Sequence, residues 1–226
     1  MAASRSPAPR LVCRPLTPAR WPDLLELFGP SGGCWGCWCM FFRQTGREFK
    51  ASHGAPNRRR FQRLVKSGAA TGLIAYSGRE AVGWCSVAPR ADYSRLARSR
   101  ELAPVDDRPV WSVVCFFVPR RHRRFGAMHR LLAAAVSHAA RHGAAAVEGY
   151  PVDSKGKRIS DLSAYHGLAS TFRAAGFREI ARRSPTRPIM RREIRARRRP
   201  PGRAVAARSA SGGAKRRAGA TRSTRG

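Results

Sequence analysis

The sequence has few acidic residues. Only 13 Asp and Glu stand against 45 Lys and Arg in 226 residues, which gives a formal net charge of +32 at pH 7. Lysine is scarce as well, and the only lysines are Lys50, Lys66, Lys155, Lys157 and Lys215. A charge of this size is typical of proteins that bind nucleic acid or anionic ligands. An excess of arginine and alanine also arises from GC-rich coding sequence, so composition leaves both explanations open.

Long hydrophobic runs are absent too. No stretch approaches the roughly 20 apolar residues of a membrane span, and residues 1–12 contain no apolar segment of the signal-peptide kind. We therefore expect no membrane contact, a cytoplasmic location and six cysteines that stay free thiols. Apolar residues still make up 42% of the chain, enough for a core. The length predicts one domain with an extension, and we expect a monomer or a homodimer.

The cysteines lack the partners that zinc requires. Cys34, Cys37 and Cys39 form a C-x2-C-x-C pattern, but a structural zinc site needs four ligands, usually as two separated pairs. No second Cys or His pair follows at a suitable spacing, and His53 is the only nearby fourth ligand. We therefore expect no metal and interpret the cluster as buried thiols in an aromatic patch.

Turn residues divide residues 11–193 into short segments of alternating type. The predicted elements, in chain order, are a strand (11–14), two helices (18–28 and 56–67), three strands (71–78, 80–89 and 110–118), a helix after Gly126, a strand (145–152), a helix (161–175) and two strands (177–183 and 188–193). This order predicts an α/β domain over residues 11–193, with a mixed, mostly antiparallel central sheet flanked by helices.

The two ends of the chain differ from this domain in composition. Residues 1–10 are expected to be a flexible leader, and residues 194–226 a disordered basic tail. From Arg195 onward there are eleven Arg or Lys and no Asp or Glu. Such a tail would hold nucleic acid by counterion release without sequence preference, but it has no aromatic residue for base stacking. An electrostatic tether and an inert extension therefore both remain open.

The stretch "VPRRHRRFGAMHRLL", residues 118–132, joins a strand to a helix through a turn that contains Gly126. The first N–H groups of a helix have no partner within it, and together with the helix dipole they form an anion site. A glycine lets a ligand approach the backbone closely. Four guanidinium groups suited to phosphate surround the turn: Arg120, Arg121, Arg123 and Arg124. The residues alone predict a phosphate or pyrophosphate site, with a solvated basic helix cap as the alternative.

The same stretch resembles the acyl-CoA signature of the GNAT superfamily of N-acyltransferases, Arg/Gln-x-x-Gly-x-Gly/Ala followed by a Leu-Leu pair. Leu131 and Leu132 match the pair, and the signature positions fall on Arg123, Arg124, Phe125, Gly126, Ala127 and Met128. The element order over residues 11–193 and the ending at Gly176-Phe177 resemble that superfamily too. The segments "GCWCMFFR", "VGWCSVAPR" and "EGYPVD" resemble one bacterial subgroup of it. The resemblance implies a GNAT-like sheet with a splayed central strand pair.

The resemblance also implies how acetyl-CoA would bind and react. Backbone groups of Phe116, Phe117 and Val118 would pair with its pantetheine arm, and the N–H groups of Arg124 to Met128 would hold its pyrophosphate. The implied reaction is N-acetyl transfer, in which a primary amine attacks the thioester directly in a ternary complex. A non-catalytic acyl-CoA-binding module and a nucleic-acid-associated basic protein are the alternatives.

Two positions depart from the superfamily's pattern. Met128 takes the place of a small residue. Phe172 stands where a tyrosine often serves as general acid to the CoA thiolate, and Tyr165 stands where asparagine is frequent. The remaining candidates are Tyr150 and Tyr165 for the acid, and Glu148 and Asp153 for the base. In the superfamily's architecture, residues 34–43 lie near the acceptor, so Trp35, Trp38 and Arg43 are predicted to line its pocket, with core packing as the alternative.

Overall fold

The computed structural model describes residues 10–69, 72–157, 159–160 and 164–194. Its centre is a seven-stranded sheet in the order β1-β2-β3-β4-β5-β7-β6. The strands are β1 (Leu11–Pro15), β2 (Leu73–Ser77), β3 (Glu80–Pro89), β4 (Trp111–Phe117), β5 (Ala146–Gly149), β6 (Arg178–Arg182) and β7 (Pro188–Glu193). Only β4 and β5 pair in parallel; the other neighbours are antiparallel. The predicted mixed, mostly antiparallel sheet is confirmed.

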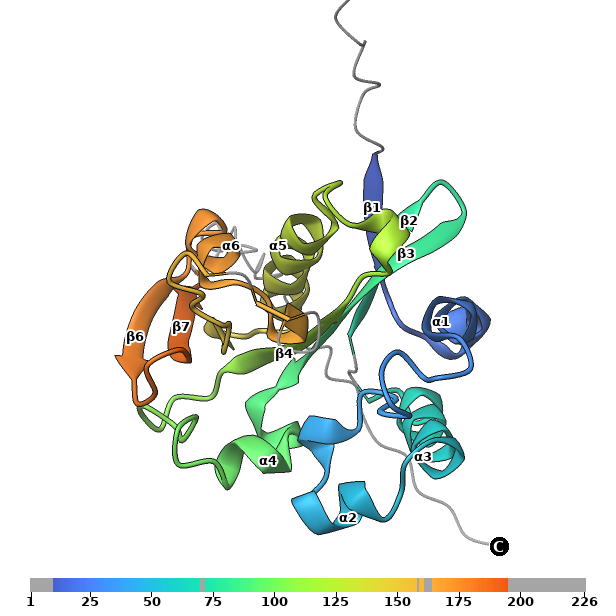
Figure 1. Ribbon diagram of the computed structural model, residues 1–226, viewed down its shortest axis with the longest axis horizontal. Coiled ribbons are helices and arrows are strands. Elements are labelled where there is room, and N and C mark those ends of the chain that lie inside the picture. Colours follow the sequence, from blue (N-terminus) through green and yellow to red (C-terminus); the bar gives the residue numbers. More distant parts are fainter. Residues whose placement is uncertain (1–9, 70–71, 158, 161–163, 195–226) are drawn as a thin grey trace, which may run out of the picture. The chain divides into compact units, whose positions relative to one another are not determined.

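Helices cover both faces of the sheet (Figure 1). The α-helices are α1 (Trp21–Phe28), α2 (Gly46–Lys50), α3 (Ala55–Lys66), α4 (Ser94–Ala97), α5 (Ala127–Arg141) and α6 (Ala169–Ala174). The 3-10 helices are η1 (Pro18–Arg20), η2 (Phe41–Arg43), η3 (Arg90–Asp92), η4 (Arg120–His122) and η5 (Ala164–His166). Figure 1 shows α5 and α6 together on one side, and α1 to α4 on the other.

The α5 helix forms because its apolar residues recur on one face. The side chains on that face pack against the sheet and α6, and burial of each stabilises the fold by about 1 to 3 kcal/mol. All five residues of the predicted stripe are buried: Leu131, Leu132, Ala135, Val136 and Ala139. On the other face, α1 and α3 enclose an aromatic cluster around Trp84, which is fully buried.

Strand β4 carries an extra residue at Val114. Ser86 of β3 lies opposite Cys115 and Val87 lies opposite Val113, so Val114 is left as a bulge. Because of the bulge, Val114 and Cys115 both pack on the α1–α4 side, while Val113 and Phe116 face α5. Strand β4 pairs with β5 only over Trp111–Val113. The two central strands therefore diverge beyond the bulge, as the resemblance implied.

Several segments differ from the sequence predictions. Strand β5 ends at Gly149 instead of reaching Val152, because Val152 pairs with Leu168 in an isolated parallel bridge. Residues 90–108, predicted as a polar loop, contain η3 and α4 and bury Tyr93. The helix predicted over 161–175 is η5 followed by α6.

Other sequence predictions fall on residues that the structure does not describe. These are residues 1–9 of the leader, residue 71 of the strand predicted over 71–78, residues 161–163 of the predicted helix and residues 195–226 of the tail. The predicted domain boundaries therefore stay predictions. Among the described helices, none has both the length and the apolar character that crossing a membrane would require.

Candidate functional site

The turn between β4 and α5 presents a row of main-chain N–H groups. Gly126 precedes α5 in the left-handed region at φ +75°, and Arg124 has φ +68° two residues earlier. In the described part of the chain, no group accepts a hydrogen bond from the N–H of residues 124–128. A Cβ added at Gly126 would have no atom within 4 Å, so the turn is open. The positive end of the α5 dipole and these free donors together form an anion site.

The basic residues of the turn have different contacts. Arg121 and His122 lie 3.4 and 3.0 Å from the same carboxylate oxygen of Glu80, which attaches the turn to the start of β3. Arg123 donates its Nε to the carbonyl oxygen of Val118 at 3.1 Å. Arg124 is exposed, and no described residue forms a hydrogen bond or an ion pair with its side chain. Its guanidinium is therefore available to an anion in the turn.

Phe172 fills the space beneath the diverging strands. Its ring is fully buried and lies between two glycines. A Cβ added at Gly149 or Gly167 would come within 2.0 or 2.9 Å of ring atoms. The Phe172 and Phe116 ring centroids are 6.2 Å apart. Phe172 therefore supports β4 from the α6 side, but it brings no hydroxyl group to the site.

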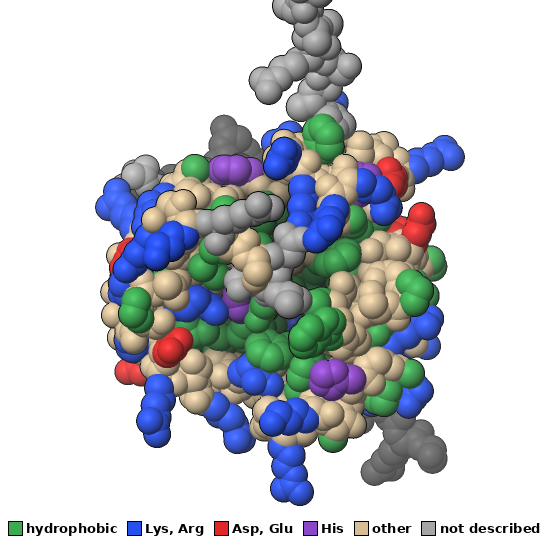
Figure 2. Space-filling model, viewed as in Figure 1, with side chains coloured by type: hydrophobic (Ala, Val, Ile, Leu, Met, Phe, Trp, Pro, Cys, Tyr) green, Lys and Arg blue, Asp and Glu red, His purple; other side chains and the backbone are tan. Residues whose placement is uncertain are grey.

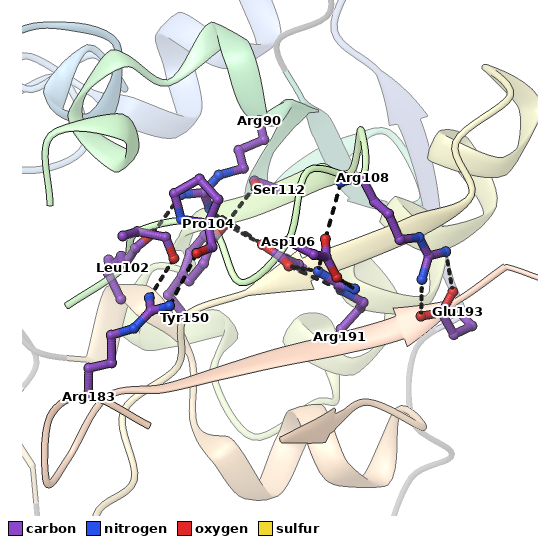
Figure 3. A network of polar contacts seen from close by, with 12 residues as sticks. Arg90, Leu102, Pro104, Asp106, Arg108, Ser112, Tyr150, Arg183, Arg191 and Glu193 are labelled. Atoms are coloured by element: carbon purple, nitrogen blue, oxygen red, sulfur yellow. Dashed lines mark hydrogen bonds and ion pairs between the residues drawn. The ribbon is translucent and has the colours of Figure 1, made fainter. Parts of the chain in front are cut away.

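Glu148 lies in a buried polar network with Arg90, Tyr150 and Arg191, and Figure 3 shows these three partners. Arg191 of β7 donates to one Glu148 carboxylate oxygen at 2.7 Å. Arg90 pairs with the other oxygen at 3.4 Å, and the Tyr150 hydroxyl donates to it at 3.0 Å. The Asp106 carboxylate binds Arg191 at 2.6 Å. Only 2% of the Glu148 side chain is exposed, so both of its oxygens serve the network.

The Tyr150 hydroxyl is occupied in the same way. It accepts a hydrogen bond from Arg90, lies 2.9 Å from the Ser112 hydroxyl and donates to Glu148. Burial, followed by the charge of Glu148, raises the pKa of Tyr150. This geometry does not suit Glu148 as a free general base or Tyr150 as a general acid, because their partners are already in place. Glu148 and Tyr150 instead form part of a hydrogen-bonded network that links β4, β5 and β7 behind the site.

We expect Glu148→Gln to lower the free energy of unfolding by about 2 kcal/mol, because Arg90 loses its carboxylate partner and Arg191 keeps only Asp106. The matched control is Glu193→Gln, since Glu193 pairs with Arg108 at 2.9 Å on the surface and is 58% exposed. The control should change stability by less than about 1 kcal/mol. Urea unfolding measures both. A Glu148→Gln protein of normal stability that lacks activity would support the catalytic base instead.

Tyr165 and His166 lie beside the diverging part of β4. Their ring centroids are 3.7 Å apart, and His166 Nδ1 lies 3.3 Å from the carbonyl oxygen of Val114 at the bulge. Burial, followed by the charge of Arg187, lowers the pKa of His166 to about 3, so the ring is neutral at pH 7. Burial raises the pKa of Tyr165 to about 12, so its phenol keeps its proton.

Sequence reasoning selected Tyr165 but missed His166. One histidine inside a segment predicted as helix has no spacing signal that would mark it. Its contact with Val114, 52 residues earlier in the chain, depends on the tertiary structure.

The two tryptophans predicted to line the acceptor pocket lie in different environments. Trp38 is 4% exposed, and its ring packs against Trp21 and Phe28 with centroids 6.2 and 5.8 Å apart. Trp38 therefore belongs to the core, the alternative that the sequence left open. The Trp35 side chain is 73% exposed.

Arg43, the third predicted pocket residue, has its side chain below the surface. Its guanidinium lies 4.8 Å from the centroid of the Tyr93 ring and 3.6 Å from the Asp92 carboxylate. These contacts join η2 to η3. A role for Arg43 in acceptor binding stays a prediction.

The cysteine cluster packs with aromatic side chains. Trp84 donates its indole N–H to the sulfur of Cys39 at 2.9 Å, and all six cysteines are free thiols. Within the described ranges, no three His, Cys, Asp or Glu side chains gather in a way that could hold a metal ion. Cys39 is buried as the sequence predicted, whereas Cys34 is exposed.

Residues 38–152 match the model of the acetyltransferase (GNAT) family. This range contains the bulge, the open turn, and strands β4 and β5 of the polar network. Comparison with curated proteins gives no match.

Among solved structures, the chain is similar to the PaiA N-acetyltransferase from Thermoplasma acidophilum in complex with coenzyme A. The identity is 11% and the TM-score 0.46, over 82% of this chain and 99% of that one. An acetyltransferase from Thermus thermophilus is 16% identical with a TM-score of 0.45, over 83% and 99% of the two chains. A structure described as histone acetyltransferase HPA2 and related acetyltransferase, from Corynebacterium glutamicum, is 15% identical with a TM-score of 0.47, over 82% and 96%.

Proposed function

The chain belongs to the GNAT family of acetyltransferases, and on that premise we propose that it transfers an acetyl group from acetyl-CoA to a primary amine. Membership of this family supports acyl transfer in general. The main support for acetyl-CoA as the donor is the open turn at Gly126, which presents free N–H groups. This turn directly follows β4, which diverges from β5. Residues 116–128 would thus hold the pantetheine arm and the pyrophosphate with one continuous stretch of chain.

The residues of the turn fit a pyrophosphate. The N–H groups of residues 124–128 would donate to its oxygens, and the exposed guanidinium of Arg124 would add charge. Met128 does not fill the turn, because its side chain packs against the core around α5. The edge of β4 beyond Val113 has no β5 partner, so the backbone of Phe116 and Phe117 would pair with the pantetheine arm. The Val118 carbonyl already accepts from Arg123.

The proposed reaction is a direct attack in a ternary complex. The neutral amine nitrogen bonds to the thioester carbonyl carbon, the carbon–sulfur bond breaks, and the nitrogen releases one proton to water. The thiolate leaves and takes up a proton, so that an amide and a free thiol are formed. We assign Tyr165 as the donor to this thiolate, because its phenol is protonated and half-buried beside β4. Glu148 and Tyr150 act as positioning residues through their network.

The test measures thiol release from acetyl-CoA with primary amines, together with acetyl-CoA binding, for the wild type and for Tyr165→Phe. We expect the wild type to release thiol only when an amine is present. The variant should lose about 100-fold or more in kcat, the range for a single general acid, while it binds acetyl-CoA normally. A wild-type protein that binds acetyl-CoA but releases no thiol would instead be a non-catalytic binding module.

The non-catalytic acyl-CoA-binding module remains a second candidate because of Phe172. Its buried ring stands where the superfamily often has the tyrosine that protonates the CoA thiolate, and it has no hydroxyl group.

We also propose a cytoplasmic location. The support is chemical, because all six cysteines are free thiols, as expected in a reducing compartment. The tail, residues 195–226, lies outside the described residues, and its binding to nucleic acid stays a prediction.

A further inference from the structure

Arg187 has buried nitrogen atoms without partners. It lies in the turn between β6 and β7, and its side chain is half-buried. Its Nε and Nη2 atoms are out of contact with solvent, and no acceptor within the described residues bonds to either of them. A buried charged donor without an acceptor is costly. Such groups are rare in native structures, and a functional role or a bound water or ion is among their explanations.

Packing and charge both relate Arg187 to the proposed reaction centre. Ile189, two residues after Arg187, lies in the buried cluster against which Tyr165 packs. Its charge acts on Tyr165 and on His166, and the His166 ring contacts the bulge carbonyl of Val114 at 3.3 Å. The charge of Glu101 acts on Arg187, but no ion pair within 4.0 Å forms between the two. Among the described residues, Arg187 therefore has no close counter-charge.

A second arginine strengthens the positive field at this place. The charge of Arg95 also acts on Tyr165. Arg95 is held in position, because its Nε donates to the Phe41 carbonyl at 2.6 Å and its guanidinium lies 4.0 Å from the Phe41 ring centroid. On the face of the molecule drawn in Figure 2, Lys and Arg side chains surround a group of hydrophobic side chains.

This field restricts the amines that the site can take. Two cations beside the reaction centre repel an ammonium group, and they lower its pKa so that more of the amine is neutral and nucleophilic. A simple cationic amine gains nothing to offset the repulsion. An amine that also carries an anionic oxygen group would supply the counter-charge that the half-buried Arg187 side chain lacks among the described residues.

We propose that Arg187 binds an anionic oxygen group, a carboxylate or a phosphate, carried by the amine that the enzyme acetylates. The inference rests on the proposed function and narrows its acceptor to amines with a second, anionic end. Arg187 is a specificity residue in this role, and Tyr165 remains the group next to the thiolate.

The test compares matched amines by thiol release from acetyl-CoA: L-alanine against L-alaninamide for the carboxylate, and phosphoethanolamine against ethanolamine for the phosphate. The wild type should favour the anionic member of at least one pair by about 10- to 100-fold in kcat/KM, the range for a hydrogen bond to a charged group. The pair that shows the preference identifies the anion. Arg187→Gln should remove the preference mainly by raising KM, and Arg187→Lys should restore part of it.

The matched control is Arg183→Gln, in the same turn. Arg183 donates to the carbonyl oxygens of Ala103 and Pro104 at 2.6 and 3.1 Å, so its loss removes one charge without touching the site. It should leave the preference unchanged, and urea unfolding checks that all variants fold. Equal use of both members of each pair, or a preference that survives Arg187→Gln, would overturn the inference alone. Acetyl-CoA binding without thiol release from any amine would overturn the proposed function, and the inference with it.

Discussion

Gly126→Glu is expected to weaken acetyl-CoA binding by about 100-fold or more while the domain stays folded. The new carboxylate would stand in the open turn and repel the pyrophosphate, and the loss of two charge-assisted hydrogen bonds accounts for a change of that size. The left-handed φ of +75° adds strain of about 1 kcal/mol for any residue with a side chain. Titration calorimetry with acetyl-CoA gives the affinity, and thermal unfolding monitors the fold.

Gly143→Glu is the matched control for this prediction. Gly143 follows the other end of α5, also has a left-handed φ, of +77°, and also has no atom within 4 Å of an added Cβ. The two variants thus share the change in charge, the backbone strain and the open surroundings. Normal binding by Gly143→Glu and weak binding by Gly126→Glu would locate the coenzyme at the turn. Equal affinities for the two variants would refute that location.

Gly149→Ala should destabilise the domain by about 3 kcal/mol or more. The added Cβ would lie 2.0 Å from Cε1 of Phe172, and the ring is fully buried. Relief of this overlap requires a shift of the ring or of β5, which is the kind of overpacking that costs most in a dense core. The midpoint and slope of urea unfolding measure the loss.

The paired change Gly149→Ala with Phe172→Leu should recover part of the stability, because the smaller side chain vacates the space that the Cβ needs. Gly46→Ala is the control without a clash, since the nearest atom to an added Cβ there lies 4.0 Å away. It should be neutral or slightly stabilising. If the double variant were no more stable than Gly149→Ala alone, the ring would not be the cause of the loss.

The sequence predicted the parts of this protein that depend on neighbouring residues. Apolar spacing located α5 and its buried stripe, and Gly78 with Arg79 located the hairpin of β2 and β3. The turn around Gly126 was predictable from a single short stretch, because the strand, the glycine and the helix start are adjacent in the chain. The divergence of β4 from β5 was predicted from the family resemblance, because the spacing of apolar residues alone would not reveal it.

The catalytic candidates were less predictable, because their environments are made by distant residues. Glu148 receives Arg90 from 58 residues earlier in the chain and Arg191 from 43 residues later. Nothing in the pattern of one short strand indicates such partners. Arg187 was missed for a related reason: it is one of many arginines, and only the burial of its nitrogens distinguishes it.

The strand order has a consequence for behaviour at high protein concentration. In the described sheet, β1 and β6 each pair on one side only, so they are the edges to which another copy could add a strand. Strand β1 ends in Arg14 and Pro15, and β6 carries arginine at both ends. Charge and proline are the features that discourage strand addition at a sheet margin. The arginine richness that first suggested ligands thus also protects the chain against self-aggregation through its sheet.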